Sequence, residues 1–194
     1  MTTRTGYSRR AIEDGTRYTL GHADSDHCLQ MTTRLATAKD LAAVHAIYAH
    51  PQIAAWLGRE SMALQDFEPL FDDLCARPSF QVWELGGVVV GFHHLSLLVS
   101  AAGISAYLST IALAPEHQGK GLAQQVLGDL IEELKRGGVA RIDLIVDSRN
   151  RRAIACYQRL GFVIERTLAR CAPQAGQMRE LSDHYMGLFL RQPA

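Results

Sequence analysis

The sequence of 194 residues lacks several features that mark particular classes of protein. Its 20 Lys and Arg balance 20 Asp and Glu, so no net charge draws the chain toward nucleic acid or anionic lipid. A membrane span needs about 18 or more clean apolar residues, and the most apolar stretch, 88–104, is broken by His93 and His94. The first residues have no apolar core of a secretory signal. We therefore expect a cytoplasmic protein that binds neither nucleic acid nor membrane.

Paired cysteines are also missing. The four cysteines are far apart and form no CxxC pair, namely Cys28, Cys75, Cys156 and Cys171. They are typical of reduced thiols. His22, His27 and Cys28 lie close together, but no second ligand pair of the usual type follows nearby, so we expect no metal. A chain of this length with 47% hydrophobic residues can bury a core without disulfides or metal.

The first thirty residues differ from the rest of the chain. Residues 1–30 are poor in Val, Ile, Leu and Phe and show no sustained period of 2 or 3.6. We interpret them as a loosely ordered extension, followed by one folded domain over residues 31–194 that begins at Met31.

The folded part alternates between strand and helix patterns. Strands are predicted at 31–35, in a hairpin of 80–85 and 88–98 around Gly86-Gly87, and at 106–113, 141–146, 162–168 and 184–190. Helices are predicted after Thr37, which offers an N-cap with Asp40 three positions on, and at 66–76, 121–136 and 151–160. A polar loop fills 170–183. This order implies an α/β fold with a mixed, mainly antiparallel sheet of about seven strands flanked by about four helices.

The most informative segment runs from Gln118 to Ala123, between an apolar strand and the longest predicted helix. Gly119 and Gly121 permit close backbone approach, and the first amides of the helix have no acceptor within it. The helix dipole adds partial positive charge at the same place, so the segment suits a pyrophosphate. A glycine-rich turn used only for packing is the alternative.

Two common phosphate motifs do not fit this segment. A P-loop needs Ser or Thr directly after the lysine, but Gly121 follows Lys120. A dinucleotide-binding fold places its GxGxxG early in the chain, whereas this loop lies past the midpoint and lacks the third glycine.

The segment instead resembles the GNAT superfamily of acetyl-CoA-dependent N-acetyltransferases, whose signature Q/R-x-x-G-x-G/A is matched by Gln118, Gly121 and Ala123. A second motif of the same fold is matched further on, at Asn150, Ala153, Tyr157, Gly161 and Phe162. The resemblance extends from about Met31 to Leu190, does not cover the first thirty residues, and is greatest to small bacterial enzymes that acetylate free amino acids. It implies a GNAT-like fold for the domain.

The resemblance also implies a mechanism in which an amine attacks the thioester directly and the CoA thiolate leaves, without a metal. Backbone groups of the strand before the loop pair with the pantetheine arm and donate an N–H to the thioester oxygen. The implied acetyl-CoA contacts are Ile111, Ala112, Leu113, Gln118, Gly119, Lys120, Gly121, Leu122, Ala123, Asn150 and Tyr157.

Tyr157 is the implied general acid. Proton transfer from a phenol of pKa about 10 to a thiolate of pKa about 8.5 is uphill by roughly 2 kcal/mol, so Tyr157 should assist rather than be indispensable. A core tyrosine is the alternative. Asn150 by its residue type caps the same helix, and similar proteins use this Asn near CoA.

The general base is not evident. Many relatives carry an acid on the central strand, but residues 107–110 contain no carboxylate. Substitutes acting directly or through water are His93, His94, Glu60, Glu84, Asp183 and His184. The adjacent His93 and His94 point to opposite faces of their strand, so at most one can face the site, and a core or surface position is the alternative for each.

We therefore predict an acetyl-CoA-dependent N-acetyltransferase whose acceptor is the primary amine of a small molecule such as an amino acid. Alternatives are acetylation of a protein N-terminus or lysine, and a non-catalytic acyl-CoA-binding sensor, for which the missing strand acid is the only sign. Segments 54–65 and 170–183 should select the acceptor, and a homodimer through the late strands is compatible with the resemblance.

Overall fold

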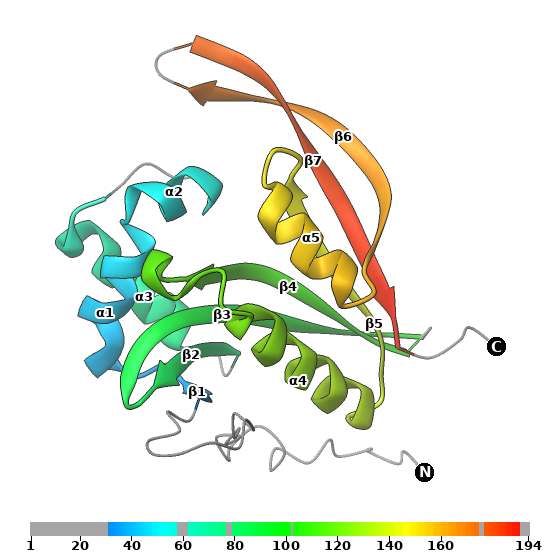
Figure 1. Cartoon of the computed structure of the whole chain (residues 1–194), viewed down its shortest axis with the longest axis horizontal. Helices are drawn as coiled ribbons and strands as arrows, with labels where there is room; N and C mark the ends of the chain where they lie inside the picture. The colour runs from blue at the N-terminus through cyan, green and yellow to red at the C-terminus, as the bar shows by residue number, and fades with distance from the viewer. Residues whose placement is uncertain (1–30, 58–61, 77–78, 102, 175–176, 191–194) are drawn as a thin grey trace.

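The computed structural model describes residues 31–57, 62–76, 79–101, 103–174 and 177–190 (Figure 1). The predicted extension at 1–30 lies outside the described residues. Seven strands form one sheet in the order β1-β2-β3-β4-β5-β7-β6. They are β1 (Met31–Leu35), β2 (Phe80–Leu85), β3 (Val88–Ser100), β4 (Gly103–Leu113), β5 (Val139–Asp147), β6 (Val163–Gln174) and β7 (Gln177–Phe189).

The described residues form five α-helices, where the sequence predicted about four: α1 (Leu41–Tyr48), α2 (Pro51–Leu57), α3 (Leu64–Cys75), α4 (Leu122–Arg136) and α5 (Arg151–Arg159). Neighbouring strands are antiparallel except β4 and β5, which pair in parallel and are connected in the sequence through α4. The predicted mixed, mainly antiparallel α/β sheet is confirmed. The order of elements implied this topology because only one strand-helix-strand crossover interrupts the antiparallel run.

Two apolar clusters hold the helices to the sheet. Buried residues of α4, such as Val126 and Leu130, pack with Ile142 of β5 and with Phe162. A second cluster joins α1 and α3 to β2 and β3 and contains four closely spaced aromatic residues, Phe67, Phe71, Phe80 and Phe92. The apolar residues of α3 and α4 recur at helical spacing in the sequence, so both helices could be predicted.

The predicted cap at Thr37 is present. The backbone N–H of Thr37 donates to the Asp40 carboxylate at 2.8 Å, and Arg34 of β1 donates to both oxygens of that carboxylate at 2.7 Å. Arg34 also binds Glu84 of β2 at 2.7 Å. Burial raises the pKa of Asp40, but the hydrogen bonds from Arg34 and Thr37 outweigh it, so the pKa lies below its ordinary value.

Two elements differ from the prediction. Helix α2 was not predicted, and the segment 170–183, interpreted as a loop, largely continues β6 and β7 as a hairpin. Figure 1 shows this hairpin extending past the end of β5. Its edge strand exposes Val163, Ile164 and Leu168. A homodimer through these strands stays a prediction.

The strands β4 and β5 separate at the middle of the sheet. Their pairing runs from Ile104 and Val139 to Leu108 and Leu144, and β4 continues for five more residues to Leu113 without a partner on β5. On the other side of β4, the register with β3 shifts so that Ser109 is one extra residue. This bulge and the separation open the sheet beside the turn that leads to α4.

Candidate functional site

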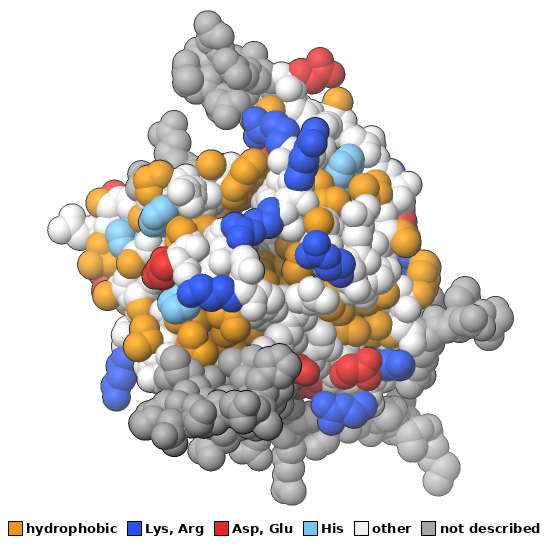
Figure 2. Space-filling view, viewed as in Figure 1, with side chains coloured by type: hydrophobic (Ala, Val, Ile, Leu, Met, Phe, Trp, Pro, Cys, Tyr) orange, Lys and Arg blue, Asp and Glu red, His pale blue; other side chains and the backbone are white. Residues whose placement is uncertain are grey.

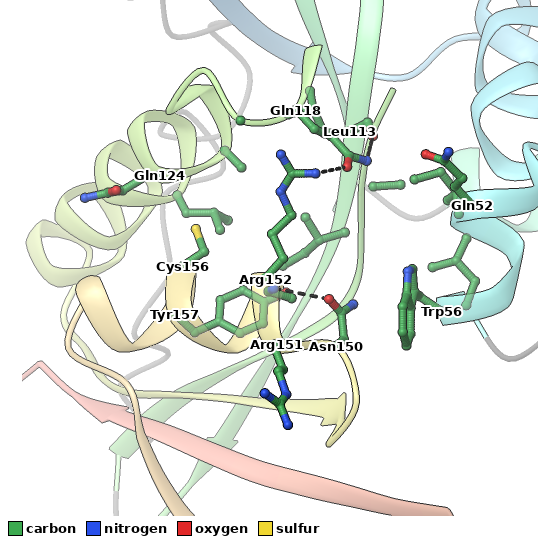
Figure 3. A pocket seen from close by; sticks show the side chains of 18 of the residues that line it. Gln52, Trp56, Leu113, Gln118, Gln124, Asn150, Arg151, Arg152, Cys156 and Tyr157 are labelled. Atoms are coloured by element: carbon green, nitrogen blue, oxygen red, sulfur yellow. Dashed lines mark hydrogen bonds between the residues drawn. The ribbon is translucent and has the colours of Figure 1, made fainter. Parts of the chain in front are cut away.

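A cavity of about 690 Å³ lies at this opening. Its walls come from α2, from the end of β4, from the turn and first residues of α4, and from the Arg149–Arg159 region that contains α5 (Figure 3). Segments that are far apart in the sequence therefore meet around one space, and two of these four segments belong to the motifs found in the sequence.

The turn before α4 has the geometry of an anion cradle. Gly119 and Gly121 both have φ of +79°, which is the left-handed region that favours glycine. The side-chain Nε2 of Gln118 donates to the carbonyl of Leu113 at 2.8 Å and so fixes the turn to the end of β4. Helix α4 begins directly after this turn, and the first backbone N–H groups of a helix have no acceptor within it.

Most of the predicted acetyl-CoA contacts line the cavity, namely Ile111, Ala112, Leu113, Gln118, Gly119, Gly121, Ala123, Asn150 and Tyr157. Two predicted contacts do not line it. Leu122 is 6% exposed and packs in the core, because it begins the apolar stripe of α4. Lys120 is exposed at the turn between the two glycines. Any contact from Leu122 would therefore come from its backbone.

Four arginines line the cavity and were not singled out in the sequence: Arg149, Arg151, Arg152 and Arg159. No acidic side chain is among the described lining residues. Arg152 reaches from α5 to the cradle, where its Nη1 donates to Oε1 of Gln118 at 2.7 Å. Figure 2 shows basic side chains gathered over the middle of this face. Although the chain has no net charge, its arginines concentrate positive charge at the cavity, which favours an anionic ligand there.

Asp147 at the end of β5 orients one of these arginines. Arg149 donates from Nε to one oxygen of Asp147 at 2.9 Å and from Nη2 to the other at 2.7 Å. Arg170 of β6 contacts the same carboxylate at 3.2 Å and binds Asp183 of β7 at 2.6 Å. The hydrogen bonds from Arg149 lower the pKa of Asp147 despite its burial. The network ties the β6–β7 hairpin to the rim of the cavity.

Tyr157 projects from α5 into the cavity (Figure 3), with its ring 5.9 Å from that of Phe162. Burial raises the pKa of the phenol well above its ordinary value, so Tyr157 holds its proton at neutral pH. Asn150 accepts a hydrogen bond from the N–H of Ala153 at 3.2 Å, which confirms it as the cap of α5. Cys156 also lines the cavity, and burial raises the pKa of its thiol.

None of the described candidates for the general base lines this cavity. His93 is buried and accepts a hydrogen bond from Nε1 of Trp83 at 2.8 Å, and burial lowers its pKa to about 4. Glu84 binds Arg34, and Asp183 binds Arg170. Thr167 and His184 share a hydrogen bond of 2.7 Å. Glu60 lies outside the described residues.

The cavity also contains residues that the sequence did not reveal. Gln52 and Trp56 stand on α2, and Figure 3 shows Trp56 across the space from Asn150. A signal existed, because Pro51 is a common first residue of a helix. In the described part of the chain, no three His, Cys, Asp or Glu side chains form a group that could hold a metal ion. No described helix has the length and apolarity to cross a membrane.

The parallel pair β4–β5, the cradle at the start of α4 and a tyrosine on α5 together define a fold of acyl-CoA-dependent acetyltransferases. Residues 41–162 match the Acetyltransferase (GNAT) family. The chain belongs to this family, and the resemblance predicted from the two motifs is confirmed.

Individual relatives are similar over most of the chain. An L-amino acid N-acyltransferase of Escherichia coli, MnaT, is 27% identical over 157 residues, which cover 78% of this chain and 91% of the relative. An L-methionine sulfoximine/L-methionine sulfone acetyltransferase of Salmonella typhimurium is 29% identical, with the same coverage of 78% and 91%. A mycothiol acetyltransferase of Thermobispora bispora is longer, and this chain spans 38% of it.

Solved structures give the same fold. The yncA protein of Salmonella typhimurium, solved with its cofactor acetyl-CoA, superposes with a TM-score of 0.65 at 27% sequence identity. The alignment covers 84% of this chain and 96% of that one. This structural relative binds acetyl-CoA, which is the ligand that the resemblance implied for this chain.

Proposed function

We propose that this protein transfers the acetyl group of acetyl-CoA to the primary amine of a small molecule, and that this molecule is an amino acid. The observation that carries the proposal is the meeting of three features in one cavity. The glycine cradle, the free edge of β4 and Tyr157 all line it. A module that served only as a structural scaffold would not need all three together.

The residues present fit acetyl-CoA. The cradle and the four arginines suit its phosphates, because backbone N–H groups and guanidinium groups are the usual phosphate partners in proteins. The last five residues of β4 have no strand partner on β5, so the backbone groups that face away from β3 are available to an extended arm of the ligand. Bound there, acetyl-CoA supplies a thioester carbon that an amine can attack.

The chain's own residues then act on that thioester. A backbone N–H among Ile111, Ala112 and Leu113 donates to the thioester oxygen as negative charge develops on it. Tyr157 donates its proton to the leaving sulfur. Burial raises the pKa of Tyr157. The same apolar surroundings disfavour a thiolate and so raise the pKa of the CoA thiol as well, which limits the pKa difference that opposes the proton transfer.

The class of amine follows from the absent carboxylate on β4. An α-amino group of pKa about 7.7 to 8.0 costs about 1 kcal/mol to deprotonate at pH 7, whereas a lysine amine of pKa about 10.4 costs roughly 4.6 kcal/mol. A site without a strong base favours the former. The names of the Escherichia coli and Salmonella relatives, which act on amino acids or their analogues, support the same choice.

A thiol-release assay with acetyl-CoA tests this proposal. Free amino acids should give higher kcat/KM at pH 7 than Nα-acetyllysine, which offers only its ε-amine. Faster turnover of the ε-amine would replace the proposal with lysine acetylation. Turnover only of peptides with free N-termini would point to protein substrates, and tight CoA binding without turnover of any amine would point to a sensor.

A further inference from the structure

Ser109 occupies an exceptional position on β4. It is the extra residue of the bulge, opposite the step from His94 to Leu95 on β3. It also follows Leu108, the last residue of β4 that pairs with β5. Bulges re-aim single side chains beside functional sites. Ser109 is exposed, although Leu108 and Ala112 on the same strand are buried.

The Ser109 hydroxyl is in contact with a buried imidazole. Its Oγ lies 2.7 Å from Nδ1 of His94, a residue that is 7% exposed. The same Oγ lies 3.4 Å from the carbonyl oxygen of His94, and the shorter contact is the stronger one. An exposed residue of β4 is therefore in contact, through its hydroxyl, with a histidine that the solvent hardly reaches.

Ser109 and His94 are not among the residues that line the cavity, but Ser109 is close along β4 to residues that do. Ser109 is two residues before Ile111, which lines the cavity. It is also the first residue of the β4 segment that lacks a partner on β5. Two of the other described candidates for the base, Glu84 and Asp183, are each paired with an arginine.

We propose that Ser109 and His94 form the proton acceptor for the attacking amine, with Ser109 in contact with the amine directly or through one water and His94 behind it. This inference rests on the proposed acetyl transfer. Imidazole is the side chain best suited to accept a proton near neutral pH, and a serine hydroxyl can pass one on. The pair takes the role of the carboxylate that β4 lacks.

The step balances. The nitrogen lone pair forms the new C–N bond to the acetyl carbon while the C–S bond breaks and its electrons go to sulfur. The proton that nitrogen loses goes to Ser109 Oγ, and the Ser109 proton goes to Nδ1 of His94. Tyr157 supplies one proton to sulfur. Afterwards His94 returns its proton through the exposed Ser109 hydroxyl to solvent and Tyr157 regains one, so the products are the amide and free CoA thiol.

The test is Ser109→Ala, measured with the best amino acid found and with acetyl-CoA. We expect kcat to fall at least tenfold while KM for acetyl-CoA and the melting temperature stay unchanged. Ser109→Thr, which keeps a hydroxyl, should recover most of the lost rate. Ser105→Ala is the matched control, because Ser105 is on the same strand within the part paired with β5, and it should behave as the wild type.

Other results would overturn the inference. A kcat for Ser109→Ala within twofold of the wild type excludes the pair, and so does a loss that Ser109→Thr does not recover. A parallel change in melting temperature or in KM for acetyl-CoA assigns Ser109 a structural role. If the wild type acetylates no amine, the proposed function fails and this inference fails with it. If the wild type is active and Ser109→Ala is equally active, only this inference fails.

Discussion

A charge placed in the glycine cradle should weaken CoA binding by a predictable amount. Gly121 has φ of +79°, and a Cβ added there would meet nothing within 4 Å. A side chain at this position therefore has room but pays a backbone cost of about 1 to 2 kcal/mol for the left-handed conformation. Gly121→Gln and Gly121→Glu share that cost and nearly the same volume, so they differ mainly in charge.

The magnitude of the difference follows from the distance. A carboxylate about 5 Å from a phosphate charge interacts unfavourably by about 3 kcal/mol at the effective dielectric constant of a protein surface, and by about 1 kcal/mol in open water. The cavity opens to solvent beside arginines that would partly offset the repulsion. We expect the Glu variant to bind acetyl-CoA about tenfold more weakly than the Gln variant.

Isothermal titration calorimetry of both variants and the wild type measures this directly, with thermal unfolding as the check that both variants fold. Raising the salt concentration should reduce the gap between Glu and Gln, because screening weakens the repulsion. Equal affinities of the two variants at low salt would show that the phosphates do not lie at the start of α4. The cradle would then serve only to pack the turn.

Three further predictions concern Tyr157, the start of the domain and the ion pair at Asp40. Tyr157→Phe should lower kcat by about one to three orders of magnitude with little change in KM for acetyl-CoA, and a wild-type rate would make Tyr157 a core residue. A chain starting at Met31 should keep its activity and its melting temperature within a few degrees, whereas one starting at Thr33 should melt lower because Met31 is 0% exposed. Asp40→Asn should lower the free energy of unfolding by about 1 to 3 kcal/mol at pH 7. Because the folded pKa of Asp40 is depressed, the stabilisation that its carboxylate provides is present above the unfolded pKa of about 3.9 and is lost at lower pH. The free energies of unfolding of the wild type and of Asp40→Asn, measured by chemical denaturation, should therefore converge at low pH.

The elements that the sequence predicted are those whose signals are local. Helix α4 begins after Gly121 in the left-handed conformation, and its Val126, Leu127 and Leu130 form one buried stripe. Asn150 caps α5 by a hydrogen bond to a residue three positions away. Each signal depends on neighbours within a turn or two, so it can be recognised without knowledge of the rest of the fold.

The features that the sequence missed depend on contacts between distant residues. Segment 170–183 is polar, but Arg170 pairs with Leu181 across β6 and β7, and that ladder makes a strand of it. The bulge at Ser109 exists only relative to His94 on β3. Arg152 meets Gln118 across 34 positions of sequence. Strand propensity and side-chain position are set by such partners more than by local composition.

The same distinction separates the two ligands of the proposed reaction. The cradle and the β4 edge offer backbone groups whose positions depend on glycine and on strand separation, so a short motif suffices to predict acetyl-CoA. In the proposed reaction the acceptor would contact side chains that no motif groups together, such as Trp56 on α2, Arg149 held by Asp147, and Ser109 bound to His94. Substitutions at these positions can change the acceptor without disturbing the cradle. Membership of the family therefore predicts the acetyl donor more directly than it predicts the amine.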